Sequence, residues 1–157
     1  MRVRWLASVA AVLMCAGCAS SPATAVVSVG DDVVATVEVA RSAEEQRVGL
    51  AGRADVAGGM LFSFGTRQER EVWMADVMVP LDVAWISDGV VVEVRTLQPC
   101  LAASTELCER WKSPGPVDAL LELPAGALGN VVAGAVVSVD ETDGNESAMA
   151  VGGVRSE

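Results

Sequence analysis

The sequence of 157 residues predicts a mainly β domain, a compact small β-barrel or sandwich of about seven or eight short strands with one or two short helices. Short runs rich in Val, Ile and Leu recur along the chain, and Gly, Asp or Pro separates them. The dipeptide Asp88-Gly89 favours the tight primed turn of a β-hairpin. One helix-start signal stands out, because Glu45 follows Ser42 by three residues, as in a capping box.

The first half of the domain is predicted to contain a hairpin, one helix and two further strands. Gly30-Asp31-Asp32 separates two Val-rich runs and suits a hairpin turn. The capping box starts the helix, and Gly52 lies where it should end. Gly58-Gly59 then interrupts the chain before two short apolar runs. The expected elements are strands 26–29 and 33–39, a helix over 43–50, and strands 60–64 and 72–74.

The second half is predicted to contain a second hairpin and two more strands. Asp88-Gly89 forms the turn of this hairpin, and Pro124 ends the strand that follows it. The last residues carry Asp, Glu, Gly, Asn and Ser with little periodicity, which is typical of a disordered tail. The expected elements are strands 82–87, 90–97 and 117–123, a helical turn over 125–130, a last strand over 131–140, and an acidic tail over 141–157.

The N-terminus resembles a bacterial lipoprotein signal peptide. Arg2 and Arg4 precede a short apolar run, and Ala16-Gly17 places two small residues directly before Cys18. In this interpretation residues 1–17 are removed, Cys18 carries the lipid, residues 18–25 form a flexible tether, and residues 26–140 fold as a single domain. Cys15 stands where such signals usually carry Leu, so an ordinary secretory signal cut after Ala25, giving a secreted soluble protein, is the alternative.

Composition excludes several classes of function. The formal net charge is −10, and removal of residues 1–17 leaves 9 basic against 21 acidic residues, a charge of −12. Such a surface repels nucleic acid and anionic lipid headgroups, so membrane attachment would depend on the lipid anchor. The sequence has no His, which excludes a Ser-His-Asp triad and a His-rich metal site. Binding of a hard cation by carboxylates stays open, but no segment shows the Asp/Asn spacing with Gly that marks a calcium loop. We therefore expect no metal and no cofactor.

Cys100 and Cys108 are the two Cys residues beyond Cys18. An isolated Cys pair in an exported chain usually forms a disulfide, which would constrain the surrounding excursion of the chain. The alternative is a redox pair, although the spacing is not Cys-x-x-Cys.

Several fragments, taken in order and spacing, resemble the domain of unknown function 192 family, also called uncharacterised protein family 0127. These fragments are residues 45–50 with Arg53, 59–64, 73–82, Asp88-Gly89, Pro99-Cys100 and 121–126, within a span from about 33 to 139. The resemblance implies a compact, mostly β domain and little biochemistry. The usual Lys-Asn-Thr after Trp-Met is Ala75-Asp76-Val77 here, so a ligand contact through that Lys is not carried over. The usual Met after Gly49-Leu50 is Ala51.

Asp76 and Asp82 are the candidate acid and base of a catalytic pair, if one carboxyl is buried enough to keep its proton. The competing interpretation is structural, with Asp82 accepting backbone N–H bonds or pairing with Arg53 or Arg47.

The large aromatic residues offer a further candidate contact. We expect two of Trp73, Trp85 and Trp111 to pack in the core, and Trp111 with Lys112 is the candidate surface contact.

Three functions remain. The favoured one is a non-catalytic, lipid-anchored module of the cell envelope that binds a small ligand, an envelope polysaccharide or an envelope protein through Arg53, Trp73, Asp76 and Asp82. The second is a structural or assembly role. The third is a hydrolase or lyase that uses Asp76 and Asp82, which would require both carboxyl groups in one pocket within about 10 Å.

Overall fold

The computed structural model describes residues 22–31 and 33–142. Within these ranges the chain forms nine β-strands, one α-helix and one 3-10 helix. Their bounds are β1 Thr24–Val29, β2 Val33–Ala40, α1 Ala43–Val48, β3 Met60–Gln68, β4 Glu71–Trp73, β5 Leu81–Ser87, β6 Val90–Leu97, η1 Thr105–Leu107, β7 Arg110–Lys112, β8 Val117–Pro124 and β9 Val137–Thr142.

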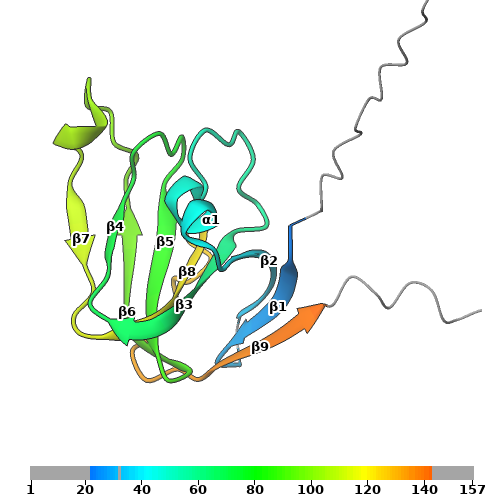
Figure 1. Ribbon diagram of the computed structural model, residues 1–157. Helices are drawn as coiled ribbons and strands as arrows, with labels where there is room; N and C mark the ends of the chain where they lie inside the picture. The colour runs from blue at the N-terminus through cyan, green and yellow to red at the C-terminus, as the bar shows by residue number, and fades with distance from the viewer. Residues whose placement is uncertain (1–21, 32, 143–157) are drawn as a thin grey trace, which may run out of the picture.

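Seven strands form one sheet in the order β6-β5-β8-β3-β2-β1-β9, and β4 pairs with β7 in a separate ribbon. Neighbouring strands are antiparallel except β2 and β3, which are parallel and joined by a crossover that contains α1. The sheet curls into a half-barrel, with α1 and the β4–β7 ribbon beside it (Figure 1). The predicted mainly β fold class is confirmed, in the form of a half-barrel.

The helix follows the predicted capping box closely. Ser42 Oγ accepts the Glu45 N–H at 3.2 Å, and the Ser42 N–H donates to the Glu45 carboxylate at 2.8 Å. The helix ends at Val48 because Gly49 takes a positive φ of 51° and its Cα faces the ring of Phe62. Strand β1 begins at Thr24, inside the segment predicted as a tether.

The segment between β8 and β9 differs from the prediction. Residues 125–130 form successive tight turns in place of a helical turn, with N–H bonds from Ala127 to Pro124 and from Gly129 to Gly126. Gly126 and Gly134 have φ near 93° and 96°, so the backbone repeatedly leaves helical and strand conformations. The last strand consequently starts at Val137. Residues 1–17 lie outside the described part of the chain, as does the predicted tail apart from Glu141 and Thr142.

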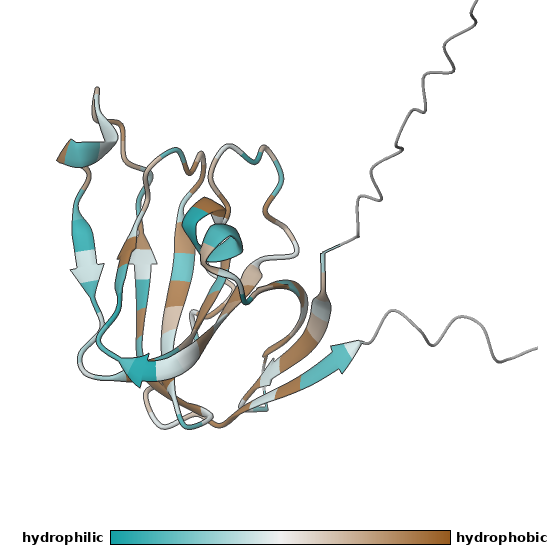
Figure 2. Cartoon of the chain, viewed as in Figure 1, coloured by the Kyte–Doolittle hydropathy of each residue, from teal (hydrophilic) through white to brown (hydrophobic). Residues whose placement is uncertain are grey.

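Figure 2 shows hydrophobic and hydrophilic residues alternating along parts of the strands. The apolar side chains divide between two cores, one on each face of the sheet. Leu120 and Trp85 belong to the first core, together with residues of the β4–β7 ribbon. Leu121 and Ala84, their immediate neighbours along β8 and β5, belong to the second core. The second core also takes Val27 and other inward residues of β1 and β2. Strands β5 and β8 thus contribute one face to each core.

Asp82 in β5 is buried, with 2% of its surface exposed, and its carboxylate organises the turns after β8. One oxygen accepts the N–H groups of Gly126 and Leu128 at 2.7 and 2.9 Å, and the other accepts the hydroxyl of Thr96 at 2.7 Å. The backbone-accepting role considered from sequence is therefore confirmed. The predicted pairing of Asp82 with Arg53 or Arg47 is wrong, because Arg53 pairs with Glu38 and Arg47 pairs with Glu44.

Cys100 and Cys108 form the predicted disulfide, with their Cα atoms 5.6 Å apart. The bridge closes a loop that contains η1. This short helix was not predicted from sequence. The N–H of Cys100 also donates to the carbonyl of Met74 at 3.1 Å, so the loop is attached to the segment that follows β4.

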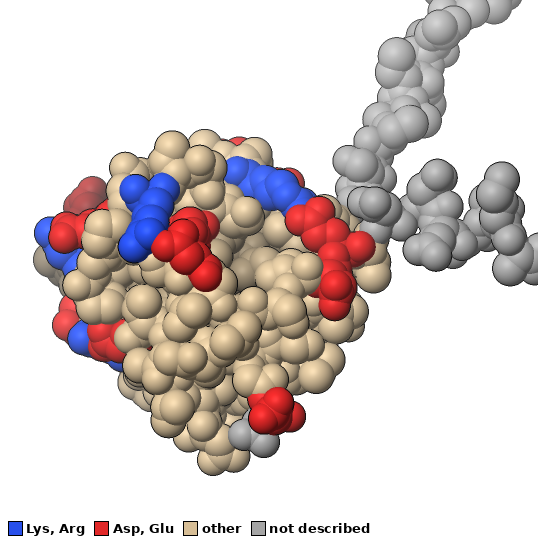
Figure 3. Space-filling view, turned by 90° about the horizontal axis from the view of Figure 1, so that it is seen from below, with Lys and Arg blue, Asp and Glu red and all other residues tan. Residues whose placement is uncertain are grey.

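The basic side chains of the described residues are mostly used in ion pairs. Six ion pairs form, and the two remaining basic side chains, Arg70 and Arg110, stack on the rings of Phe64 and Trp73. On the face seen in Figure 3, basic and acidic groups lie next to one another near the margin, and the middle carries none. No concentrated basic patch forms within residues 22–31 and 33–142.

Replacing Asp82 by Ala should lower the free energy of unfolding by about 3 kcal/mol, because two buried N–H groups lose a charged acceptor. Urea unfolding of the purified chain measures this. Asp140→Asn, an exposed carboxylate in β9, is the matched control and should change stability by less than about 0.5 kcal/mol. Equal effects of the two substitutions would contradict the structural role of Asp82.

Candidate functional site

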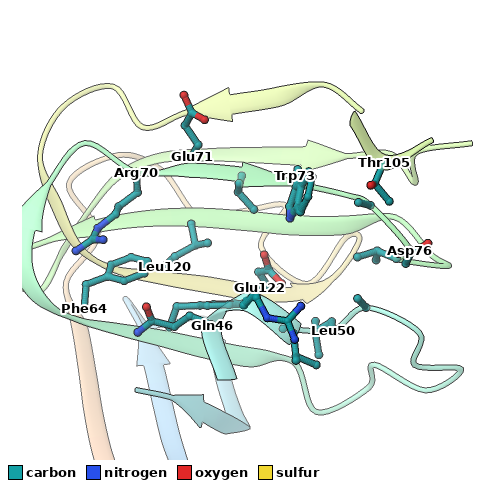
Figure 4. Close-up of a pocket in the computed structure, with 18 of the residues that line it drawn as sticks. Gln46, Leu50, Phe64, Arg70, Glu71, Trp73, Asp76, Thr105, Leu120 and Glu122 are labelled. Carbon is teal, nitrogen blue, oxygen red and sulfur yellow. The ribbon is translucent and has the colours of Figure 1, made fainter. Parts of the chain in front are cut away.

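A cleft of about 730 Å³ opens beside α1, on the sheet face of the first core. Its floor is formed by β8 and β3, through Leu120, Glu122, Phe62 and Phe64. Helix α1 and the turn after it form one wall, and β4 with the segment after it forms the opposite wall (Figure 4). Thr105 of η1 contributes to the lining, so the disulfide loop also borders this cleft.

Glu122 is the most unusual residue of the cleft. It lies in the interior strand β8, opposite Met60 of β3 and Val83 of β5, and only 4% of its surface is exposed. Its carboxyl group points into the cavity, below Trp73 (Figure 4). Among the described residues, no protein group donates a hydrogen bond to it. Burial raises the pKa of Glu122 from 4.5 to about 8, so the isolated protein holds it largely protonated near neutral pH.

Aromatic rings line the cleft around this carboxyl group. Phe62 is buried, and Phe64 and Trp73 are half-buried. The guanidinium of Arg70 lies 4.2 Å from the ring centre of Phe64, and its buried Nε atom has no partner in the described part of the chain. Leu50, Val72, Val77 and Leu120 add apolar surface. Apolar and aromatic side chains therefore surround one acid at the floor of the cleft, and the other charged residues of the lining lie around them.

Charges at the mouth are balanced only in part. Arg47 pairs with Glu44, and Glu71 pairs with Lys112 and points away from the cavity (Figure 4). Asp76 is exposed at the mouth and has a positive φ of 58°, an uncommon conformation for a residue with a side chain. Its carbonyl accepts the N–H of Gly52 at 2.8 Å, which joins the two walls.

The structure brings together two of the four residues proposed from sequence for ligand binding. Trp73 and Asp76 both line the cleft. Arg53 lies beside a smaller second pocket, where its guanidinium binds Glu38 at 2.5 and 2.8 Å and lowers the pKa of that carboxyl. Asp82 points to the opposite face of the sheet, because it neighbours Leu81 and Val83 of the first core along β5.

The structure does not leave Trp111 and Lys112 free for the surface contact that was considered from sequence. Trp85 is fully buried in the first core, and Trp111 packs partly buried against the same core. Lys112 is occupied by Glu71. Trp73 is thus the Trp that borders the cleft.

Sequence reasoning missed Glu122 as a site residue. The available signal was a single acid inside the apolar run 119–123, where strand alternation gives both faces apolar neighbours. A charged residue in a strand that is buried on both faces indicates either a buried ion pair or a site.

Neither metal chemistry nor a membrane span is indicated by the described residues. No group of three or more His, Cys, Asp or Glu side chains within 22–31 and 33–142 is arranged to hold a metal ion. None of the helices described has both the length and the apolar character needed to cross a bilayer.

Protonation of Glu122 should make stability depend on pH. Below about pH 4.5 the folded and unfolded states both hold this proton, whereas between about 4.5 and 8 the unfolded state alone releases it, so the free energy of unfolding falls as pH rises. Glu122→Gln removes this loss. The free energy of unfolding of the variant, relative to that of the wild type, should rise by an amount on the order of 4 kcal/mol between about pH 5 and 8.

Urea unfolding across this pH range measures the difference between the two proteins. Glu69→Gln, an exposed acid at the mouth, should track the wild type at every pH. A difference between the wild type and Glu122→Gln that is constant with pH would show that Glu122 is not protonated in the fold.

Two solved structures resemble this one. A protein from Sinorhizobium meliloti 1021, provisionally described as a transcription regulator, aligns with a TM-score of 0.66 and 27% identity, over 76% of this chain and 96% of that chain. A protein of unknown function from Novosphingobium aromaticivorans DSM 12444 aligns with a TM-score of 0.61 and 23% identity, over 76% and 94%. At that identity the second likeness shows the fold alone. No curated protein matches the sequence.

The family model DUF192, described as an uncharacterized ACR, matches residues 25–139. This range contains every strand from β2 to β8 and the whole cleft. It also agrees with the fragments that resemble this family in the sequence. The chain belongs to the domain of unknown function 192 family.

Proposed function

We propose that the domain is a non-catalytic binding module that takes a small ligand into the cleft above Glu122. The observation that carries this proposal is the Glu122 carboxyl group, buried and without a protein donor among the described residues, at the floor of an aromatic-lined cavity. The carboxyl group faces the open cleft, so a ligand there can supply the hydrogen-bond partner that the described residues do not supply.

Binding is favoured over catalysis by the chemistry of the lining. The catalytic pair considered from sequence needs Asp76 and Asp82 in one pocket, and Asp82 lies on the other face with both oxygens occupied. The cleft contains no Cys, no Ser and, like the whole chain, no His, and its lining has no His or Lys that could activate the hydroxyl of Thr105.

We propose further that the module is exported and anchored at Cys18. Thr24 and Ala25 pair with both β2 and β9, and Ala25 is fully buried. Cleavage after Ala25 would therefore remove two residues of β1. This supports cleavage before Cys18 over the alternative of a secreted soluble protein. The Cys100–Cys108 disulfide suits an oxidising compartment.

The description of the S. meliloti protein as a transcription regulator is not carried over to this chain. DNA is bound mainly through Lys and Arg, and the eight basic residues described here are all in ion pairs or stacked on rings. The net charge of −10 also opposes DNA binding.

A thermal-shift screen of small ligands and envelope glycans against the chain from Ala19, which retains every described residue, tests ligand binding. A ligand at about 100 times its dissociation constant stabilises the folded state by about 2.7 kcal/mol. Ala51→Trp should abolish the shift by filling the cleft, and Ala102→Trp, exposed outside it, should leave the shift unchanged. Equal shifts in both variants would place binding elsewhere and refute the proposal.

Cys18→Ala in the full chain should move the protein from the membrane fraction to the soluble fraction, because the lipid is attached to the thiol. Fractionation of cells followed by immunoblotting measures this. Cys100→Ala, which breaks the disulfide of the folded domain and leaves Cys18 in place, should stay in the membrane fraction. A Cys18→Ala protein that remains membrane-bound contradicts the anchor.

A further inference from the structure

We propose that the ligand of the cleft is a small organic ammonium ion, with its charged nitrogen at Glu122 and its apolar body against Phe62, Phe64 and Trp73. This inference rests on the proposed function and specifies the ligand's charge. It starts from three features of the same cavity: a buried carboxyl group that lacks a donor, aromatic faces around it, and an excess of acids in the lining.

The lining favours a cation by its balance of charge. Acids face the cleft from the β3–β4 turn, β4, the segment after β4 and β8, whereas bases face it from α1 and the β3–β4 turn. The acids are Glu69, Glu71, Asp76 and Glu122, and the bases are Arg47 and Arg70. After the Arg47–Glu44 and Glu71–Lys112 pairs are set aside, three acids stand against one base. Neutral side chains face Glu122 from β3 and β5.

Arg70 is the base of the lining that has no ion pair with another described residue, and it does not serve as the counter-ion of Glu122. Arg70 stacks on Phe64, and its terminal nitrogen donates to the Thr66 carbonyl at 2.8 Å. Burial is the cause of the raised pKa of Glu122, and no guanidinium lowers it. The positive partner that would ionise this carboxyl group is therefore missing from the described residues.

An ammonium ion supplies what the site lacks. Its N–H groups donate to the Glu122 carboxylate in a charge-assisted hydrogen bond, which is about twice as strong as a neutral one. An aromatic face attracts a desolvated cation by about 2 kcal/mol. One face of Phe64 and one face of Trp73 already hold the guanidinium groups of Arg70 and Arg110, so this attraction comes from Phe62 and from the remaining faces. A neutral ligand would accept from protonated Glu122 or donate weakly to it, and would leave the proton in place. The two ligand classes therefore differ in whether binding releases a proton.

Proton release distinguishes an ammonium ligand from a neutral ligand through the pH dependence of the binding affinity. An ammonium ligand binds the ionised form of Glu122, so its affinity should rise about tenfold per pH unit up to about pH 8 and then level off. The affinity of a neutral ligand should not rise in this way. Benzylammonium and benzyl alcohol are a matched pair for this test, because they have nearly the same shape and differ in charge.

Isothermal titration calorimetry of the chain from Ala19 with both probes, from about pH 6 to 8, performs the test. Benzylammonium should bind at least tenfold more tightly than benzyl alcohol at pH 8. Glu122→Gln should remove that preference and the pH dependence, while binding of benzyl alcohol changes by less than about twofold. Asp140→Asn, at the far edge of the sheet, should behave as the wild type.

The outcomes separate this inference from the function on which it rests. Equal, pH-independent binding of both probes, lost in Ala51→Trp, would overturn the ammonium assignment and leave the binding cleft intact. Binding of neither benzylammonium nor butylammonium at millimolar concentration would also overturn the assignment, and the ligand screen would then decide on the cleft itself. Preference for the cation that persists in Glu122→Gln would refute the role of Glu122.

Discussion

The antiparallel pairing of β8 with β5 on one side and β3 on the other is the constraint on which the whole domain depends. Because β8 is an interior strand with an apolar core on each face, its alternate residues enter both cores: Leu120 enters the first, and Leu121 and Leu123 enter the second. A shift of its register by one residue would exchange the two sets. Both cores would then lose their packing together, so they cannot be regarded as independent units.

Several local features hold this strand in register. A side chain at Gly59 would overlap the carbonyl oxygen of Glu122 and a methyl group of Leu123, and Gly59 also has a positive φ of 66°. On the other side Asp82 binds the turns that follow β8. Both contacts hold the C-terminal end of β8, where Glu122 lies.

Strands whose signal is local could be predicted from the sequence, and elements that depend on distant pairing could not. The β1–β2 and β5–β6 hairpins follow from turn residues between Val-rich runs, and α1 follows from Ser42 and Glu45. Strand β7 has only three residues and exists through its pairing with β4, so no local pattern marks it. Trp73 and Asp76 could be proposed for the site because they flank a recognisable motif. Glu122 belongs to the same cleft only through the register of β8, which no single segment reveals.

The pairing of β1 with β9 joins the first strand of the domain to its last, through residues as far apart as Thr24 and Thr142. Six residues of β1 consequently have one open hydrogen-bonding edge until the final strand is available. A polypeptide that emerges N-terminus first, from a ribosome or a translocation channel, cannot complete this sheet before its C-terminal region has emerged. The sheet is therefore completed only when synthesis or transport is almost finished. Until then an incomplete chain has an unprotected strand edge at β1.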